Sequence, residues 1–401
     1  MTRLKPQPWM IAAPARRVMA ALESERAGCA RFVGGCVRNA LLGEPVADLD
    51  IATQLPPATV ERVMLDAGIA VHQTGIEHGT LTVVADHHPF EITTLRRDVE
   101  TDGRRAVVAF TESWEEDAQR RDFRMNALYC SIDGEVFDPT GGGLEDIRGR
   151  RIVFVGEPET RLREDYLRIL RFFRFNAWYG AGAVDPAGLA ACAKLKDGLA
   201  NISAERIWIE LKKLLSAPYP VNVLMDMQAS GVLAAVLPEV ADLKLAWRMC
   251  LLDKEAPDAM RRFLAMLPKD GDVVASLARR LKLSNDEKDR LVYAARDETA
   301  VSPKLTPQEL RVVLYRRGPV IAGDLAALAQ AAGVDEFGDW AKLMADIAAW
   351  VRPVMPIDGQ DVMAAGVAPG PDVGEALRKV ETAWVESDFT LEREALLALL
   401  P

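Results

Sequence analysis

Residues 32–53 read FVGGCVRNALLGEPVADLDIAT and combine two adjacent glycines, one arginine and a D-x-D pair in one short segment. The pattern predicts a strand that enters a glycine turn, one or two helical turns, and a second strand that carries the acidic pair. Because side chains alternate along a strand, we expect Asp48 and Asp50 to point to the same side. Carboxylate oxygens suit Mg²⁺, so the pair predicts a metal site, although a solvated strand edge can show the same pattern.

The glycine pair adds a phosphate site to this metal site. Gly34 and Gly35 lie between the first strand and the helical turns, where missing side chains let backbone N–H groups approach a phosphate. Arg38 follows one turn later and is placed to reach the same anion. Each feature alone is also explained by a tight turn with a surface arginine. Together they predict a site for a nucleoside triphosphate that is chelated by magnesium.

The composition is that of a large folded protein. The chain has 401 residues, of which 49% are hydrophobic and 27% charged, which is typical of two or three globular domains. The sequence shows no signal-peptide pattern and no apolar run of membrane-spanning length, so we expect a cytoplasmic protein with no membrane partner. The cysteines are scattered and without a CxxC pair, and are expected to be reduced and mostly buried: Cys29, Cys36, Cys130, Cys192 and Cys250. All four histidines lie in the first quarter, which excludes a histidine-rich metal site in the rest of the chain.

Strand and helix patterns alternate in the first part of the chain. Strands are predicted in 30–35, 47–53, 80–95 and 128–139, with a hairpin turn inside 80–95. Helices are predicted in 8–28, 57–68 and 114–129. The polar stretch 96–108 has no apolar period and is predicted to be a mobile loop.

Helical patterns dominate after about residue 150, where alanine and leucine become abundant. We therefore predict an α+β protein with an N-terminal head built on a mixed sheet and an all-α remainder. The predicted parts are a catalytic head at 1–150, a helical neck at 151–220, and an all-helical body and tail at 221–401.

The segment GGCVRNALLGEPVADLDIAT resembles the signature of the class II nucleotidyltransferases, which are the tRNA CCA-adding enzymes and the bacterial poly(A) polymerases. Their pattern is G-G-x-V-R-D, followed shortly by D-x-D. This chain has Asn39 where the family more often has Asp, so Asn39 is left out of the predicted metal site. The resemblance implies a head similar to the palm of the DNA polymerase beta superfamily, with Mg²⁺ held by Asp48 and Asp50.

Two further segments match the family in the same order. FEITTLR resembles the strand that supplies a third acidic residue, which here is Glu91. RRDFRMNA resembles the motif that contacts the sugar and phosphates of the nucleotide, which implies this role for Arg121, Asp122 and Asn126. On a predicted helix, Asp122 and Asn126 share one face, and a surface ion pair is the alternative interpretation.

The segment EDYLRILRFFRF at 164–175 predicts a helix with Asp165, Arg168 and Arg171 on one face. It resembles the E-D-x-x-R motif, in which an aspartate and an arginine imitate a template base. A carboxylate accepts a hydrogen bond from an exocyclic amine, and an arginine donates to a ring nitrogen or a carbonyl. The Asp165–Arg168 pair is therefore expected to accept CTP and ATP and to reject UTP and GTP. The family usually has proline where this chain has Tyr166.

Positive charge gathers in the predicted neck despite a net charge of −10. Arg174, Lys212 and Lys213 are expected to contact the 3′ acceptor end of a tRNA, although solvated helix faces with nearby acids explain the same charges. A second cluster lies in the body: Arg261, Arg262, Arg279, Arg280 and Lys282.

The polar segment 96–119 resembles the flexible loop that the family uses to switch from C to A addition, with Asp102, Gly103 and Arg104 at its expected tip. The alternative interpretation is a solvated charged loop without a role in catalysis.

The resemblance implies template-independent addition of C, C and A to the 3′ end of tRNA by a two-metal mechanism. The alternative within the family is a poly(A) polymerase that adds A tails to RNA. The acidic composition, with a pI near 5.2, favours CCA addition because bacterial poly(A) polymerases tend to be basic. A catalytically idle RNA-binding relative is a third possibility, and the intact set of Asp48, Asp50 and Glu91 argues against it.

Overall fold

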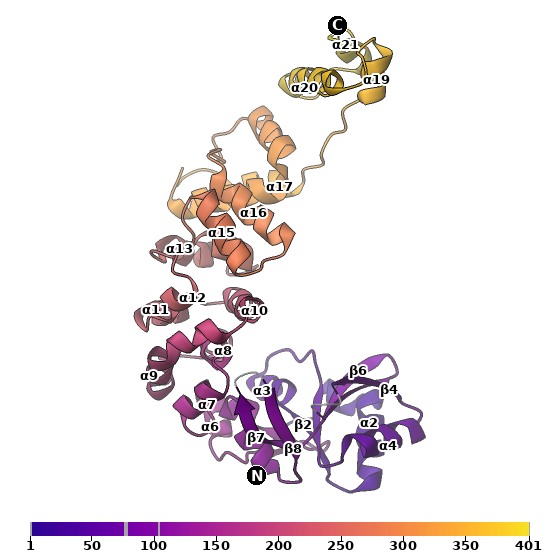
Figure 1. Cartoon of the computed structure of the whole chain (residues 1–401), viewed down its shortest axis with the longest axis vertical. Coiled ribbons are helices and arrows are strands. Elements are labelled where there is room, and N and C mark those ends of the chain that lie inside the picture. Colours follow the sequence, from indigo (N-terminus) through magenta and orange to yellow (C-terminus); the bar gives the residue numbers. More distant parts are fainter. Residues whose placement is uncertain (1, 76–78, 103–104, 401) are drawn as a thin grey trace. The chain divides into compact units, whose positions relative to one another are not determined.

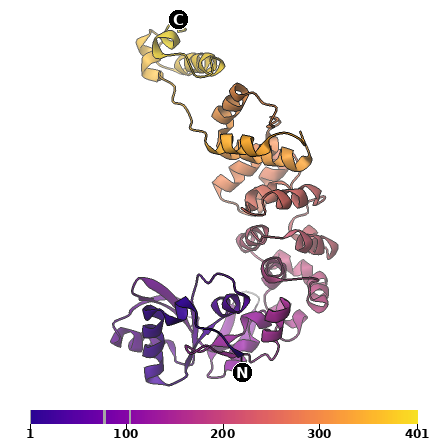
Figure 2. The ribbon, with the colours of Figure 1, turned by 180° about the vertical axis from the view of Figure 1, so that it is seen from behind.

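The computed structural model describes residues 2–75, 79–102 and 105–400. It divides into two compact units, Met1–Pro238 and Glu239–Pro401. Strands occur in the indigo-to-purple part of the ribbon, and the rest is coiled helix in both views (Figures 1 and 2). The predicted α+β class, with a mixed sheet in the head and helices beyond it, is confirmed. The borders at 150 and 220 stay a prediction.

An eight-stranded sheet forms the centre of the head. Its spatial order is β1 (Thr2–Arg3), β10 (Glu135–Phe137), β9 (Tyr129–Cys130), β2 (Ala30–Val33), β3 (Asp50–Thr53), β6 (His88–Thr94), β5 (Thr80–Ala85) and β4 (Ala70–Gly75). Neighbouring strands pair antiparallel except for β3 and β6, which run parallel. The predicted strands are present in this sheet, whereas β1 and β4 were not predicted.

Helices cover the sheet where their apolar sides are buried. α1 (Pro8–Ile11) leads into α2 (Ala13–Glu25), and α2 packs against α4 (Pro57–Asp66) and β5. The fully buried Val18, Leu22 and Met64 belong to these two helices. α3 (Gly35–Leu42) follows β2 directly. The prediction of helices in these segments is confirmed.

The segment predicted to be a mobile loop contains a two-stranded antiparallel ribbon, β7 (Arg96–Asp102) and β8 (Arg105–Phe110). The prediction of a loop is therefore wrong for these strands, because two arms of a chain can satisfy their backbone N–H and C=O groups by pairing with each other. The base of the ribbon is held by Leu95 N–H, which donates to Thr53 O at 2.7 Å. Of the expected loop tip, Gly103 and Arg104 lie outside the described residues.

The predicted helix over 114–129 is wrong in its second half. α5 (Trp114–Gln119) ends early, and only a short 3₁₀ turn, Arg124–Asn126, follows. The backbone between them pairs with a distant segment instead: Arg124 N–H donates to Val153 O at 2.9 Å, and Val155 N–H donates to Asp122 O at 3.0 Å. Asp122 and Asn126 therefore do not share a helix face.

The predicted helix over 164–175 is also interrupted. α7 (Pro158–Glu164) ends before Asp165, whose φ of −154° is extended, and α8 (Leu167–Tyr179) begins two residues later. The Asp165 side chain accepts a hydrogen bond from Leu167 N–H at 3.1 Å, which satisfies a donor at the start of the new helix. This local bond competes with a continuous helix.

The remaining helices of the first unit are α6 (Gly143–Gly149), α9 (Pro186–Leu195), α10 (Ala204–Leu215), α11 (Val221–Ala229) and α12 (Val232–Val236), with a 3₁₀ segment at Lys196–Asn201. The second unit contains α13 (Lys244–Leu252), α14 (Ala259–Leu264), α15 (Gly271–Arg280), α16 (Asn285–Arg296), α17 (Pro307–Ala332), α18 (Trp340–Ala348), α19 (Gly359–Ala364), α20 (Pro371–Glu386) and α21 (Arg393–Leu397). α17 is kinked at Gly318, where Pro319 follows. No described helix is both long and apolar enough to cross a membrane. The five cysteines are free and buried, as predicted.

Candidate active site

A glycine turn connects β2 to α3. Gly34 has φ 72° and ψ −124°, a conformation that residues with a side chain rarely adopt. A Cβ atom at this position would lie 3.8 Å from Arg121 Nη1 and 3.8 Å from a carboxylate oxygen of Asp50. The turn therefore passes close to both a guanidinium and an acidic side chain.

Two acidic residues, Asp48 and Glu91, act on the charge of Asp50 beside this turn. Asp50 begins β3 and pairs in register with Glu91 on the parallel strand β6, so the two side chains lie on the same side of the sheet. Asp48 precedes the strand, so strand alternation does not fix the direction of its side chain. The expectation that Asp48 and Asp50 point to the same side stays a prediction. Burial raises the pKa of Asp50, and the charges of Glu91 and Asp48 raise it further, while Arg121 opposes them.

This acidic group fits a divalent cation by its charge. Within the described ranges, no three or more His, Cys, Asp or Glu side chains are gathered into a ready-made metal cage. The pKa of Asp50 is nevertheless raised, first by burial and then by the charges of Glu91 and Asp48. Hard carboxylate oxygens bind Mg²⁺ well, and a bound cation would remove the repulsion between these residues.

A cavity of about 410 Å³ lies next to the glycine turn. It is lined by all nine residues predicted to bind nucleotide: Gly34, Gly35, Arg38, Arg121, Asp122, Asn126, Asp165, Arg168 and Arg171. Four further residues that the sequence did not single out also line it: Arg120, Leu167, Phe175 and Arg206. The lining thus contains six arginines but only two aspartates, which suits an anionic ligand.

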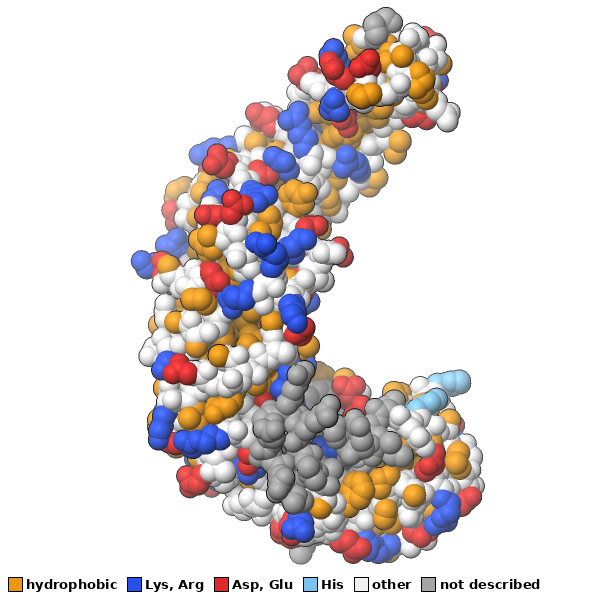
Figure 3. Space-filling model, viewed as in Figure 1, with side chains coloured by type: hydrophobic (Ala, Val, Ile, Leu, Met, Phe, Trp, Pro, Cys, Tyr) orange, Lys and Arg blue, Asp and Glu red, His pale blue; other side chains and the backbone are white. Residues whose placement is uncertain are grey.

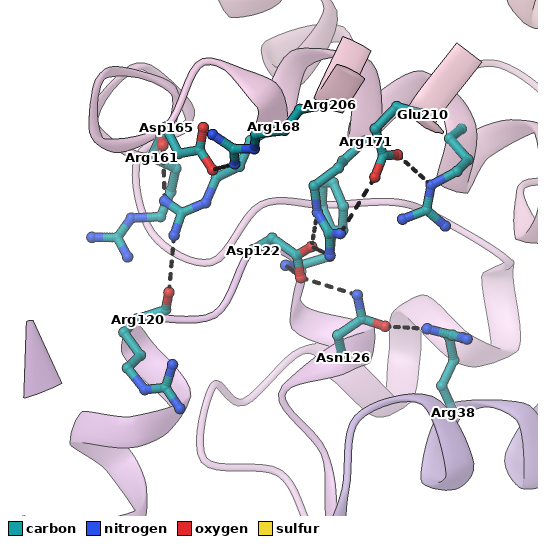
Figure 4. A network of polar contacts seen from close by, with 12 residues as sticks. Arg38, Arg120, Asp122, Asn126, Arg161, Asp165, Arg168, Arg171, Arg206 and Glu210 are labelled. Atoms are coloured by element: carbon teal, nitrogen blue, oxygen red, sulfur yellow. Dashed lines mark hydrogen bonds and ion pairs between the residues drawn. The ribbon is translucent and has the colours of Figure 1, made fainter. Parts of the chain in front are cut away.

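A chain of polar contacts runs through one wall of the cavity (Figure 4). Arg38 Nη1 donates to Asn126 Oδ1 at 2.6 Å, and Asn126 Nδ2 donates to Asp122 Oδ1 at 3.0 Å. Asp122 Oδ2 accepts from Arg171 Nε at 2.9 Å. Burial alone would raise the pKa of Asp122, but Arg171 and the bond from Asn126 lower it to about 2. The Asp122–Asn126 contact predicted from a helix face therefore exists, although no helix makes it.

The proposed base-recognition residues, Asp165 and Arg168, are each held by other groups. Asp165 Oδ2 accepts from Arg206 Nη2 at 2.7 Å. Arg168 Nη1 donates to Glu164 Oε2 at 2.5 Å, and Arg168 Nη2 donates to Arg120 O at 3.2 Å (Figure 4). Both side chains line the cavity, so one potential acceptor and one potential donor face it.

A buried pair fixes Arg121. Its Nη2 donates to Asp117 Oδ2 at 2.9 Å, and Tyr129 Oη donates to the same carboxylate oxygen at 2.6 Å. Burial opposes ionisation of Asp117, but Arg121 and Arg120 hold its pKa well below the usual range. Asp117 and Tyr129 were not predicted from the sequence, because neither belongs to a spacing pattern.

The residues predicted to bind RNA lie in different settings. Arg174 Nε donates to Glu210 Oε2 at 2.5 Å, and its guanidinium lies 4.3 Å from the Phe175 ring centre, so it is part of the cavity-wall network. Lys212 and Lys213 are exposed in the last turn of α10. In the body cluster, Arg262 is fully buried and pairs with Asp253, so it cannot contact RNA. Figure 3 shows basic and acidic side chains interspersed over the helical part of the chain.

Three family models match the chain in order. They are described as "Poly A polymerase head domain" at residues 30–153, "Probable RNA and SrmB- binding site of polymerase A" at 183–244, and "tRNA nucleotidyltransferase domain 2 putative" at 254–400. The first of them contains the glycine turn and the three acidic residues.

Named relatives match over nearly the whole chain. The CCA tRNA nucleotidyltransferase 1, mitochondrial, of Homo sapiens is 34% identical over 386 residues, which cover 92% of this chain and 86% of the relative. The CCA-adding enzyme of Geobacillus kaustophilus is 32% identical over 381 residues and covers 92% of each chain.

Solved structures agree with these relatives. The Bacillus stearothermophilus CCA-adding enzyme in complex with CTP superposes with a TM-score of 0.72 at 30% identity, over 97% of each chain. The Thermotoga maritima CCA-adding enzyme complexed with tRNA shares the fold, with a TM-score of 0.64 at 17% identity over 100% of this chain and 99% of that one. With the glycine turn, the acidic residues and the arginine-lined cavity in the head, the chain belongs to the family of CCA-adding tRNA nucleotidyltransferases.

Proposed function

We propose that this protein adds C, C and A, one nucleotide at a time, from CTP and ATP to the 3′ end of tRNA, with release of pyrophosphate and without a nucleic-acid template. The observation that carries the proposal is the cavity of about 410 Å³, which joins all nine predicted nucleotide-binding residues next to Asp50. Relatives that are named for this activity match the chain over most of its length.

In this proposal, the triphosphate binds at the glycine end of the cavity. Backbone N–H groups at Gly34 and Gly35 and the guanidinium groups of Arg38 and Arg121 provide the donors. Asp122 acts indirectly, because it holds Arg171 and Asn126 in the wall beside the nucleotide.

The base of the nucleotide binds at Asp165 and Arg168. Asp165 accepts a hydrogen bond from the amino group of C or A, and Arg168 donates to the adjacent ring nitrogen or carbonyl. A U or G base presents a carbonyl to Asp165, and the two acceptors repel each other. One pair of side chains thus admits CTP and ATP and excludes UTP and GTP.

The family uses divalent metal ions, and we propose Mg²⁺ for this chain, held by Asp48 and Asp50. Two such ions, held by these carboxylates, would supply activation of the attacking 3′ hydroxyl and stabilisation of the leaving pyrophosphate. Glu91 lies in register with Asp50 and is the third acid of the site, suited to help hold the ion or to accept a proton from the 3′ hydroxyl.

The same proposal assigns roles to the rest of the chain. Residues 1–150 act as the catalytic head, 151–220 as the neck that carries base recognition, and 221–401 as a body and tail that bind tRNA. Lys212, Lys213 and Arg174 contribute positive charge for the acceptor end, with Arg174 held by Glu210. We place the activity in the cytoplasm, although some relatives are named as mitochondrial.

The test uses tRNA transcripts that end before CCA, after C and after CC, each incubated with one labelled nucleotide and Mg²⁺. Stepwise incorporation of C, C and A that then stops supports the proposal. Long A tails instead favour the poly(A) polymerase activity that two of the matching family models name. Absence of any incorporation by the wild-type protein refutes both activities.

A further inference from the structure

Arg38 differs from the other arginines that line the cavity. Each of the others forms an ion pair with a carboxylate, through the pairs Arg120–Asp117, Arg121–Asp117, Arg168–Glu164, Arg171–Asp122 and Arg206–Asp165. Within the described part of the chain, Arg38 forms no ion pair, and the polar atoms that it contacts are neutral. It is nevertheless only 7% exposed.

The neutral partners of Arg38 surround its guanidinium. Nη1 donates to Asn126 Oδ1 at 2.6 Å, and Nη2 donates to Tyr179 Oη at 2.9 Å, while the Tyr179 ring centre lies 4.1 Å from Cζ. Burial lowers the pKa of Arg38, and the charge of Asp122 opposes this effect without cancelling it, in line with a buried charge that contacts no carboxylate of the described residues directly. Such a buried charge is unfavourable unless a ligand neutralises it.

Asn39 occupies the place where a carboxylate could contact Arg38 directly. Its Oδ1 accepts from Arg38 Nε at 3.0 Å and from Nη2 at 2.8 Å, the two donors that a carboxylate would take in a bidentate ion pair. Its Nδ2 donates to Pro45 O at 2.7 Å. An aspartate here would neutralise Arg38 and would place an oxygen against the Pro45 carbonyl. An amide can both orient the arginine and hold the segment that leads to Asp48.

Arg38 also lies beside the backbone that a polyphosphate would approach. A Cβ atom added to Gly35 would lie 3.8 Å from Arg38 Nη2, so the guanidinium and the start of α3 adjoin each other. The N–H groups at the start of this helix and the guanidinium thus favour negative charge at one place.

We propose that Asn39 is a positioning residue that keeps Arg38 as a net positive charge, and that a polyphosphate ligand supplies the missing counter-charge. The inference deepens the proposed function. It rests on that function in one respect, namely that the polyphosphate is a nucleoside triphosphate or its product, pyrophosphate. It assigns a charge-setting role to the position where this chain departs from the family pattern.

The test measures the affinity of the full chain for inorganic pyrophosphate by calorimetry in metal-free buffer at fixed ionic strength. Asn39→Asp should weaken binding about tenfold or more and make binding less sensitive to salt, because the new carboxylate pairs with Arg38. Asn39→Ala removes the hydrogen bonds without adding charge and should weaken binding no more than about threefold. Asn222→Asp, at an exposed position of the same unit, adds the same charge and should leave binding unchanged.

Two outcomes overturn the inference. Asn39→Asp with wild-type affinity shows that the charge at this position is irrelevant, and Asn39→Ala as weak as Asn39→Asp shows that only geometry counts. Circular dichroism checks that each variant is folded. If Asn39→Asp is not, Arg38→Gln replaces it, because this change leaves no orphaned charge. The affinity of Arg38→Gln for pyrophosphate should be at least tenfold weaker than that of wild type, and an unchanged affinity of this variant also refutes the inference.

The addition assay separates this inference from the proposed function. If the wild-type protein adds C, C and A but the pyrophosphate affinities contradict the expected order, the inference fails and the function stands. If the affinities follow the expected order but no nucleotide is added to tRNA, the function fails and the charge role of Asn39 stands.

Discussion

Two clusters of this protein contain the same kinds of side chain, arginine and aspartate, but differ in the balance of positive and negative charge. In the second unit, three arginines pair with three aspartates, through the ion pairs Arg261–Asp324, Arg290–Asp324, Arg290–Asp258 and Arg262–Asp253. Asp324 and Arg262 there are 0% exposed, and each arginine has an acidic partner. The cavity of the first unit is lined by six arginines and two aspartates.

The difference distinguishes a structural cluster from a binding site. In the balanced cluster each charge is neutralised within the protein, so the cluster holds helices together and offers nothing to a ligand. In the cavity five of the six lining arginines pair with a carboxylate, but Arg120 and Arg121 share Asp117 and, among the described residues, Arg38 contacts only neutral atoms, so positive charge remains for an anion. Changes in the cavity should therefore alter activity more than stability, and changes in the balanced cluster should do the reverse.

The largest effect is expected for Asp50→Asn. Nucleotide addition should fall at least a thousandfold, about 4 kcal/mol in transition-state free energy, because the metal site loses its central carboxylate. The melting temperature should hold or rise, since burial and the acidic neighbours make the Asp50 charge unfavourable in the folded protein. Rates of CMP incorporation and thermal unfolding check both statements. Asp66→Asn, which changes an exposed residue of α4, is the control and should keep its activity. Activity of Asp50→Asn within tenfold of wild type would contradict the assignment.

Asp324→Asn should show the opposite behaviour. It removes the negative charge that faces Arg261 and Arg290, which should destabilise the second unit by about 3 kcal/mol. The rate of nucleotide addition at low temperature should stay close to wild type. Denaturant unfolding measures the loss, with Asp346→Asn on the surface as control. A large loss of activity without a loss of stability would break the distinction between the two clusters.

Asp122 tests whether the paired arginines of the cavity also stabilise the fold. Its folded pKa of about 2 lies below the ordinary value, so its contribution is complete above the ordinary pKa and is lost as the pH falls toward 2. The shift corresponds to about 2 kcal/mol at neutral pH. The stability difference between wild type and Asp122→Asn should therefore be largest near pH 6 and shrink as the pH falls toward 2. A difference that is constant with pH would show that the carboxylate charge contributes nothing.

The smallest effect is expected for Arg206→Gln. This change frees Asp165 Oδ2 from the 2.7 Å bond that orients it, so the preference for CTP over UTP in kcat/KM should fall about tenfold, or about 1.4 kcal/mol. Arg206→Lys should keep more of the preference, and Arg163→Gln on the surface should keep all of it. An unchanged preference would mean that Asp165 is oriented without Arg206.

The sequence predicted those parts of the site that depend on local spacing. The strand, glycine turn and helix around Gly34, and nine of the residues that line the cavity, follow from short motifs and the family resemblance. Residues that act through distant partners left no such signal. Arg206 bonds to Asp165, and Glu210 pairs with Arg174, from a helix that lies well beyond either in the chain.

The mistaken helices have the same origin. The pattern over 114–129 is locally helical, but the backbone at Asp122 and Arg124 bonds to Val153 and Val155 and leaves the helix. The break at Asp165 depends on a side-chain bond to Leu167 N–H and on Arg206. Periodicity measures only which side chains could share a face, so it cannot predict where a tertiary hydrogen bond replaces a helical one.

The parallel pairing of β3 with β6 has a consequence for how activity emerges during folding. Asp50 and Glu91 become neighbours only when these two strands align. In the chain the two strands are separated by α4, β4 and β5, so their pairing closes a long loop. Such non-local pairing is slow to form, because the chain loses much entropy before the contact stabilises it. Recovery of enzymatic activity after dilution from denaturant should therefore follow the slowest refolding phase of the head, well after helix formation is complete.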